Sequence, residues 1–176
     1  MPGNIILRKG DHIVSVIDTA TGSRKTIEEF ILSIPPGQRP NPSAYMSQAE
    51  IDSQLALFND GAVRFFTSHP SGTIGPENSF VFPKMYLEEL YRASGGNMRA
   101  VEKKLGLPSG YLDNVQAAVI ERPNVQIPSG NEAGALPGYW VPGGYTAGGV
   151  PEAVIPGQIK ADDVIAKSAG DLFNGK

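Results

Sequence analysis

A glycine- and proline-rich run over residues 128–156, PSGNEAGALPGYWVPGGYTAGGVPEAVIP, limits what this chain can fold into. Glycine at this density does not suit a packed helix, and proline removes backbone donors from a regular sheet. The run nevertheless contains Trp140, the only tryptophan of the chain, together with Tyr139 and Tyr145. Flexible linkers are made mainly of small residues and do not need such large aromatic side chains. We therefore expect long ordered loops or β connections in this run.

The composition of the 176-residue chain fits one domain with an appended arm. Hydrophobic residues make up 40 %, which is enough for one core, and the net charge of −3 argues against a general nucleic-acid-binding protein. The chain has no cysteine, which excludes disulfides, thiolate zinc sites and cysteine nucleophiles. No stretch is long and apolar enough for a membrane span, and the N-terminal residues lack the features of a signal peptide.

The N-terminal part of the sequence predicts an arm. Residues 12–18 are rich in β-branched residues and predict a strand. Residues 26–34, TIEEFILSI, fit a second strand or a short helix, and a strand hairpin is favoured. The proline-rich segment 35–43 predicts an extended connector. We therefore expect a strand arm over residues 1–34 and a main domain over residues 35–176.

The main domain has the pattern of an α+β fold. Ser47 and Glu50 have the spacing of a capping box, and Gly106 follows a helical pattern as a C-terminal cap. Helices are expected over 47–58, 84–94, 97–106 and 160–173, and strands over 62–68, 79–83 and 115–122. The expected fold is a small mixed or antiparallel sheet flanked by three or four helices, with long Gly/Pro-rich loops.

The sequence lacks the motifs of familiar metal and phosphate sites. His12 and His69 belong to no HxxxH or HxH pattern, and Asp162 and Asp163 fit the acidic first turn of the last expected helix. The glycine-rich run contains neither GxGxxG before a helix nor GxxxxGK[ST]. We therefore expect no bound metal and no phosphate cradle of either kind.

Arg64 and Glu152 remain as candidate catalytic residues. Arg64 alternates with Val63 and Phe65 in an expected strand, so it points to the opposite face. There it can bind a phosphate or carboxylate, or pair with a nearby acidic residue. Glu152 follows glycines and leads into an apolar run. A carboxylate there can stabilise a sugar cation, activate a nucleophile, or lie on the surface of an edge strand.

Other residues of the run 128–156 are candidate ligand-binding groups. Ser129, Asn131 and Glu132 can hydrogen-bond a ligand or cap a turn. Trp140 and Tyr145 can stack on a base or plug the core. We expect Trp140 in the core, while both placements stay open for Tyr145.

Four segments together resemble a domain found at the C-terminal tips of bacterial polymorphic toxins of the Rhs, filamentous-haemagglutinin and type VI effector kinds. These are NDGAVRF (59–65), SFVFPK (79–84), VEKKLGLPSGYL (101–112) and residues 127–155. The likeness spans about residues 33–156. It implies a toxin-like catalytic domain over 35–176, with residues 1–34 as a strand arm or delivery junction. It also implies a secreted effector, delivered into a target-cell cytoplasm without its own signal peptide, and a cognate immunity protein as partner.

The order of three elements is similar, more loosely, to the tuberculosis necrotizing toxin family of NAD glycohydrolases and to ADP-ribosyltransferases. These elements are Arg64 in a strand, Phe80 in the next strand, and GGVPE, in which Glu152 stands in place of a catalytic Gln. The STS strand and the ExE or QxE pair are missing. The similarity implies an ADP-ribosyltransferase-like fold and an NAD pocket, with Arg64 on the pyrophosphate, an aromatic ring over the nicotinamide and Glu152 at the ribose.

Three hypotheses for function result. The first is an enzyme that consumes NAD, with Arg64, Glu132 and Glu152 as catalytic residues. Its NAD-binding residues are Arg64, Phe80, Asn131, Tyr145 and Thr146. The second is a metal-independent nuclease with His69 or Glu152 as base and Arg64 on the phosphate, for which residues 99–106 are the visible basic cluster. The third is a non-catalytic module that binds a partner protein through the arm. The oligomeric state stays open.

Overall fold

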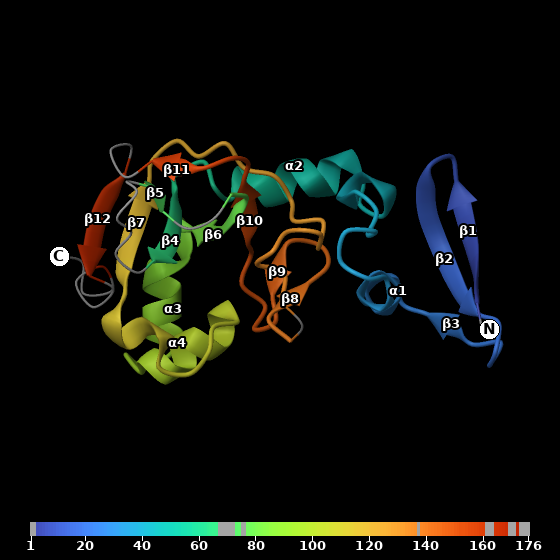
Figure 1. Cartoon of the computed structure of the whole chain (residues 1–176), viewed down its shortest axis with the longest axis horizontal. Coiled ribbons are helices and arrows are strands. Elements are labelled where there is room, and N and C mark those ends of the chain that lie inside the picture. The colour runs from blue at the N-terminus through green and yellow to red at the C-terminus, as the bar shows by residue number, and fades with distance from the viewer. Residues whose placement is uncertain are drawn as a thin grey trace.

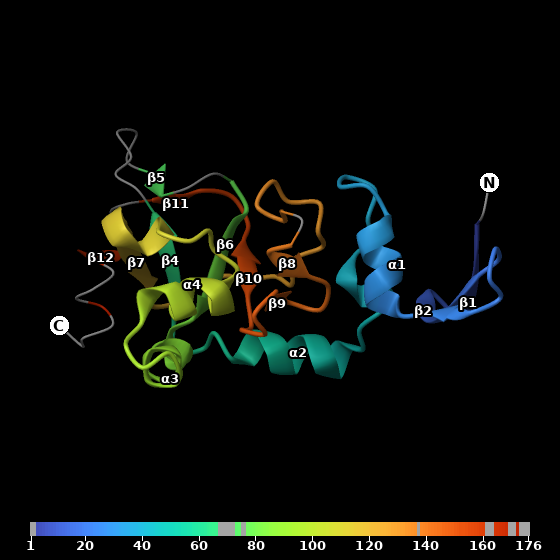
Figure 2. The ribbon, with the colours of Figure 1, turned by 90° about the horizontal axis from the view of Figure 1, so that it is seen from below.

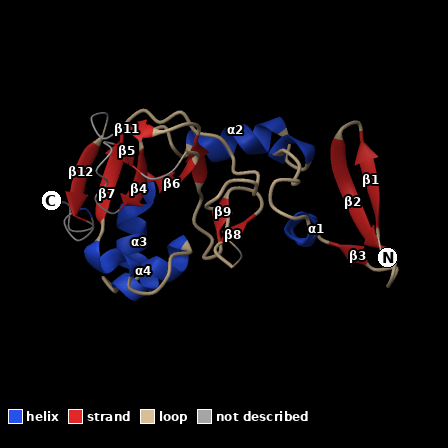
Figure 3. Cartoon of the chain, in the orientation of Figure 1, coloured by secondary structure: helices blue, strands red, loops and turns tan. Residues whose placement is uncertain are grey.

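The chain folds into an α+β structure with several antiparallel sheets (Figures 1 and 3). The computed structural model describes residues 3–66, 73–74, 77–136, 138–160, 164–168 and 172. The N-terminal sheet lies at one end of the molecule and the main sheet at the other (Figure 1). Loops, drawn tan in Figure 3, occupy much of the region between them. Among the described helices, none is long and apolar enough to cross a membrane.

The arm is a three-stranded antiparallel sheet followed by a helix. Its strands are β1 (Asn4–Lys9), β2 (His12–Asp18) and β3 (Arg24–Lys25), in the order β1-β2-β3, and the helix is α1 (Ile27–Ser33). The prediction of a strand over 12–18 is confirmed, whereas the preference for a strand over 26–34 is wrong. The side chain of Thr26 caps the helix by accepting from the Glu29 N–H at 3.0 Å, and Phe30 and Ile31 are buried on one face. Residues 4–9 take the place of the expected hairpin partner.

The arm and the connector contact the glycine-rich run 128–156 through apolar packing and hydrogen bonds. Ile13, Val16, Phe30 and Ile31 of the arm share one apolar cluster with Ala135 and Trp140. In the connector, Arg39 Nη1 donates to the carbonyl of Gly130 at 2.7 Å, and Arg39 Nε donates to the carbonyl of Ile34 at 2.9 Å. Figures 1 and 2 both show α2 (Gln48–Ala56) running lengthwise between the arm and the main sheet.

The main sheet has five antiparallel strands in the order β10-β6-β4-β7-β12. They are β4 (Ala62–Phe66), β6 (Ser79–Pro83), β7 (Gln116–Ile120), β10 (Ala153–Ile155) and β12 (Ile165–Ser168). Two small sheets accompany it, one of β5 (Thr73–Ile74) with β11 (Ile159–Lys160) and one of β8 (Trp140–Val141) with β9 (Tyr145–Thr146). The sheet strands expected near 62–68, 79–83 and 115–122 are thereby confirmed.

Helices α3 (Leu87–Ala93) and α4 (Met98–Leu105) pack on one face of the main sheet. Short 3-10 helices lie at Pro42–Ala44, Lys84–Tyr86 and Tyr111–Asn114. The apolar cluster on this face joins sheet residues such as Val63, Phe65 and Phe82 to Leu90, Val101 and Leu105. The expected capping box at Ser47 and Glu50 is present, and Gly106 ends α4 with a φ of 70°. Local capping chemistry therefore sets these helix boundaries.

The helix expected over residues 160–173 is wrong for its central part. Ile165–Ser168 form β12, which pairs antiparallel with β7, with Ile165 opposite Val119. Without β12, the N–H and C=O groups along that edge of β7 would lack a strand partner. The need to pair this edge overrides the local helical pattern. Asp162 and Asp163 lie outside the described residues.

Candidate functional site

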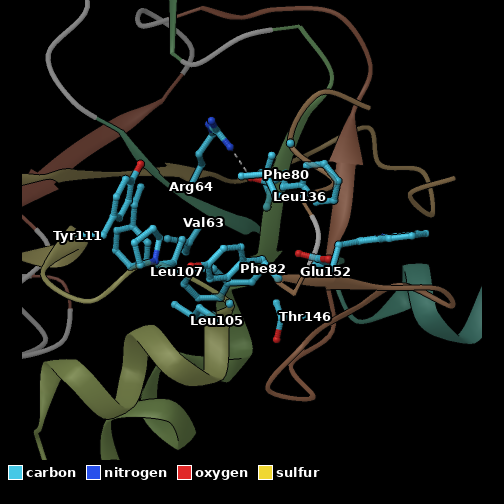
Figure 4. Close-up of a pocket in the computed structure, with 17 residues that line it drawn as sticks. Val63, Arg64, Phe80, Phe82, Leu105, Leu107, Tyr111, Leu136, Thr146 and Glu152 are labelled. Atoms are coloured by element: carbon cyan, nitrogen blue, oxygen red, sulfur yellow. Dashed lines mark hydrogen bonds between the residues drawn. The ribbon is translucent and has the colours of Figure 1, made fainter. Parts of the chain in front are cut away.

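A cavity of about 290 Å³ lies beside strands β4 and β6 (Figure 4). The two strands pair at Ala62–Pro83 and at Val63–Phe82. One residue further along β4, the side chain of Arg64 reaches across, and its Nη1 donates to the carbonyl of Phe80 at 2.9 Å. The volume is near the lower end of the range for small-ligand pockets, about 300–1,000 Å³. The cavity can therefore hold one ring with its substituents.

The cavity has an apolar lining with a few polar side chains. The wall is built by β4, β6, the end of α4 with the turn after it, and the run 128–156. Its apolar members include Val63, Phe65, Phe82, Leu105, Leu107 and Leu136, and its aromatic side chains include Phe80, Tyr111 and Trp140. Arg64 and Glu152 supply charged or ionisable groups, and Thr146, Tyr111 and Tyr139 supply hydroxyl groups. Such a lining lowers the local dielectric and strengthens any polar contact made inside it.

Arg64 is a half-buried cation without an acidic partner. No carboxylate of the described residues forms an ion pair with it, and its Nε is buried without a hydrogen-bond partner. Burial lowers the pKa of the Arg64 guanidinium, an effect that the neighbouring Tyr111 partly offsets. An arginine stays charged in this situation, so it can bind an anionic group of a ligand.

Glu152 stands directly before β10 and is 7 % exposed. Its backbone N–H donates to the carbonyl of Gly144 at 2.9 Å, and the same carbonyl accepts from Gln54 Nε2 at 2.7 Å. The side-chain Oε1 is buried without a hydrogen-bond partner. Burial, reinforced by the charge of Glu132, raises the pKa of the Glu152 carboxyl to about 8. The carboxyl is therefore mainly protonated at neutral pH.

Arg64, on β4, and Glu152, directly before β10, line the same cavity. Val63 pairs with Phe82, and Ala153 pairs with Val81, so β6 lies between β4 and β10. Two neighbouring strand spacings place the two backbones about 10 Å apart. Figure 4 shows Arg64 and Glu152 on opposite sides of the hollow, with Val63 and Phe82 between them in this view. Both residues line the cavity, while the Arg64 guanidinium is turned toward the carbonyl of Phe80. That the two side chains act together on one ligand stays a prediction.

Three of the expected site residues lie outside the lining of this cavity. Glu132 accepts from Ser129 N and Oγ and from Gly130 N, and Asn131 accepts from the N–H groups of Gly37 and Arg39. Both side chains therefore fasten loops, which is the turn-capping alternative that their spacing also allowed. Tyr145 is 39 % exposed in β9 and does not line the cavity.

Phe80 and Thr146 do line the cavity, but their polar atoms are already used. The carbonyl of Phe80 accepts from Arg64. The hydroxyl of Thr146 donates to the carbonyl of Lys104 and accepts from the Val150 N–H. Phe80 can therefore offer a ligand its ring, whereas Thr146 serves mainly to hold β9 against the end of α4.

The sequence predicted Trp140 only as a core residue and did not predict Tyr111 at this site. Trp140 is buried as expected, and it also lines the cavity. Tyr111 was not expected at the site, and it is placed there by the turn after α4. The buried carboxylate of Glu102 holds that turn by accepting from the N–H groups of Gly110 and Leu112, at 3.0 and 2.8 Å. The glycines at 106 and 110 were the available signal for this turn.

Close packing explains glycine at positions 130 and 148 of the run 128–156. A Cβ atom at Gly130 would overlap the ring of Trp140, and one at Gly148 would overlap the backbone of Lys104. Gly130 also has a φ of 93°, which side chains other than glycine rarely adopt. Glycine thus lets the run approach the tryptophan and the end of α4 closely enough to close the wall of the cavity.

Among the described residues, neither a histidine nor a cluster of metal-ligating side chains lines this cavity. Within the described residues, no group of three acidic or histidine side chains is arranged to hold a metal ion. His12 is half-buried in β2 and does not line the cavity, and His69 lies outside the described residues.

Comparisons of the chain with protein-family models, with curated proteins and with solved structures find no match. A function for the cavity is therefore argued from its own residues.

Proposed function

We propose that the chain binds NAD at this cavity and breaks the bond between nicotinamide and ribose, as an NAD glycohydrolase or an ADP-ribosyltransferase. The observation that supports the proposal is that Arg64, on β4, and Glu152, directly before β10, line one apolar cavity. A fixed cation on one side and a carboxyl on the other suit a substrate with a phosphate at one end and a sugar that becomes cationic at the other.

The size of the cavity decides which part of NAD would enter it. A volume of about 290 Å³ suits the nicotinamide ring and part of its ribose, but not a complete dinucleotide. Arg64 uses one of its N–H groups on the carbonyl of Phe80. Its remaining donors can bind the pyrophosphate, because a guanidinium offers five N–H groups in a planar fork. The adenosine half would extend past Arg64 over the surface.

The chemistry needs few protein groups. The bond from ribose C1′ to the pyridinium nitrogen breaks, and its electron pair neutralises the ring nitrogen of the departing nicotinamide. The ribose then carries oxocarbenium character, which the Glu152 carboxylate stabilises across an apolar space. For hydrolysis, a water oxygen bonds to C1′ and its proton passes to Glu152. For transfer, a hydroxyl or amine of an acceptor takes the place of water.

The broader setting belongs to the same proposal. The likeness of residues 33–156 to polymorphic-toxin tips supports a secreted effector that reaches a target-cell cytoplasm and is neutralised by a cognate immunity protein. The order of Arg64, Phe80 and Glu152 along an antiparallel sheet supports an ADP-ribosyltransferase-like arrangement. No bound metal is required by the steps above.

A protein-binding role of the arm is a second candidate. Ile5, Leu7 and Val14 are 51 %, 49 % and 59 % exposed on β1 and β2. Apolar side chains this exposed favour a surface that contacts another protein. The nuclease hypothesis has less support, because Arg99 in the basic cluster already pairs with Glu102 and Asp113. A binding arm is compatible with an enzymatic main domain.

Loss of NAD in the presence of the purified chain tests the proposal. The wild type should convert NAD to nicotinamide and ADP-ribose, or transfer ADP-ribose to an acceptor. Glu152→Gln and Arg64→Lys should each reduce kcat/KM at least about tenfold. Glu121→Gln and Arg122→Lys, at exposed positions outside this cavity, are the matched controls. Folded wild-type protein that leaves NAD intact, with or without candidate acceptor proteins, would refute it.

A further inference from the structure

Three residues that line the cavity each have a buried polar atom without a hydrogen-bond partner. In the described part of the chain, the buried side-chain atoms without a hydrogen-bond partner are Ser15 Oγ, Tyr45 Oη, Arg64 Nε, Trp140 Nε1 and Glu152 Oε1. The last three belong to residues that line the same cavity. Buried polar groups are normally paired, so a cluster of exceptions calls for a partner that the protein itself does not supply. A bound ligand would need two acceptors and one donor or positive charge.

We propose that Glu152 and the aromatic side chains of Phe80, Phe82, Tyr111 and Trp140 form a site for a planar organic cation. The cavity then binds the positively charged pyridinium form of the nicotinamide ring more tightly than neutral rings of the same shape. This inference rests on the proposed use of the cavity for NAD, and it names the part of the ligand that gives selectivity.

Glu152 lacks a positive partner within the protein. No ion pair involves it among the described residues, and Arg64 instead donates to the carbonyl of Phe80. Figure 4 shows the carboxyl of Glu152 on the far side of the hollow from Arg64. The charge that acts on it most clearly is that of Glu132, which has the same sign. A cation that enters the cavity would therefore be the first opposite charge in contact with this carboxyl.

The walls favour an organic cation over a metal ion. Phe80, Phe82, Tyr111 and Trp140 line the cavity, and aromatic faces attract cations that have lost their water. A hard metal ion needs six or more oxygen ligands, whereas the described lining residues supply one carboxyl, that of Glu152. One face of the Trp140 ring already holds the Arg39 guanidinium, with Cζ 5.1 Å from the ring centre. Its Nε1–H is left to donate to an acceptor on the ligand ring, such as the amide oxygen of nicotinamide.

Cation binding should be coupled to release of a proton. In the empty cavity, burial raises the pKa of Glu152 to about 8, so the carboxyl is mostly neutral at pH 7. A cation beside it favours the carboxylate and displaces the proton. The other ionisable residues that face this carboxyl are Arg64, Tyr111 and Tyr139 around the cavity and Glu132 beside it. A neutral ring has no reason to displace the proton, so its affinity should change little with pH.

The test compares 1-methylnicotinamide, which is a cation, with neutral nicotinamide. Trp140 is the only tryptophan and lines the cavity, so its fluorescence reports occupancy directly. At pH 8 the cation should bind at least about tenfold more tightly than the neutral ring. Its affinity should fall about fivefold from pH 8 to pH 7, as the ionised fraction of a group with a pKa near 8 falls. Calorimetry at pH 7 in two buffers of different ionisation enthalpy should count close to one proton released, because nearly all of the carboxyl is protonated there before binding.

Glu152→Gln is the decisive variant, because it keeps the shape and removes the charge. It should bind both probes with similar affinity and without the pH dependence, and a thermal melt checks that it is folded. Equal affinity of the wild type for the two probes, binding of neither, or an unchanged preference in folded Glu152→Gln would overturn the inference. Failure of the proposed function is distinguishable: cation selectivity without NAD consumption refutes the enzyme alone, and NAD consumption without cation selectivity refutes this inference alone.

Discussion

Arg64 and Glu152 line one cavity from opposite sides of β6, with Arg64 on β4 and Glu152 directly before β10. Arg64 bridges to the carbonyl of Phe80, and Glu152 presents a buried oxygen without a partner. Removal of the two side chains should therefore affect stability differently. Arg64 stabilises the sheet through its hydrogen bond, whereas the buried carboxyl of Glu152 destabilises the folded state at neutral pH.

Replacement of Arg64 by alanine should affect both stability and binding. The carbonyl of Phe80 loses its donor, and a buried carbonyl without a partner costs about 1–3 kcal/mol. The free energy of unfolding in urea should fall by that amount, and the KM for NAD should rise at least about tenfold. Arg122→Ala, at an exposed position, should change neither. A normal KM in the Arg64 variant would show that the guanidinium does not bind the phosphates.

Replacement of Glu152 by glutamine should stabilise the fold as the pH rises. The pKa of Glu152 is raised from 4.5 to about 8, so the folded chain keeps a proton that the unfolded chain has lost. The unfolded state therefore binds fewer protons between pH 4.5 and 8, and wild-type stability falls across this window. At about 1.4 kcal/mol for each pKa unit, the loss reaches up to about 4 kcal/mol at pH 8.

Glu152→Gln removes this loss, so urea unfolding from pH 4 to 9 should show the two proteins diverging with pH. Glu121→Gln, with an exposed carboxylate, should run parallel to the wild type. Parallel curves for Glu152→Gln as well would mean that the carboxyl is solvated in the folded chain.

The rate of NAD cleavage should increase with pH if the carboxylate of Glu152 is the working form. In the free protein its pKa of about 8 leaves a minority ionised at pH 7. The value of kcat/KM should therefore rise about tenfold per unit at low pH and level off above pH 8. A profile that falls through pH 8 would assign Glu152 the role of a general acid instead.

Loss of the Glu102 carboxylate should disturb the turn that carries Tyr111. Glu102 is 1 % exposed, and it accepts from two backbone N–H groups and lies 3.1 Å from Arg99 Nε. Glu102→Ala should lower the free energy of unfolding by about 3 kcal/mol, because buried donors lose their partner. Glu88→Ala breaks an exposed pair with Arg92 and should cost less than about 1 kcal/mol. Equal effects in urea unfolding would contradict the role of Glu102.

Close packing of glycine against Trp140 gives a further prediction. Gly130→Ala places a Cβ against the indole ring at a φ of 93°, and should lower the free energy of unfolding by about 2–4 kcal/mol. Gly10→Ala also has a positive φ, 64°, but nothing lies within 4 Å of its Cβ. Backbone strain alone should then cost about 1 kcal/mol. A similar loss in the two variants would show that contact with Trp140 does not require glycine.

Local chemistry in the sequence was enough to predict several elements. The capping box at Ser47 and Glu50, the glycine that ends α4 and the apolar strands β4, β6 and β7 all depend on residues close together in the chain. The absence of cysteine likewise excludes thiol chemistry without any structure.

Only the tertiary structure decided which candidate residues share a site. The order β10-β6-β4 brings Glu152 to the same cavity as Arg64, while hydrogen bonds to neighbouring loops hold Asn131 and Glu132 outside its lining. Residues 165–168 form a strand because they pair with the edge of β7, although their local sequence pattern favours a helix. Strand order, edge pairing and burial arise from contacts between segments that are distant in sequence. Patterns among neighbouring residues do not predict those contacts.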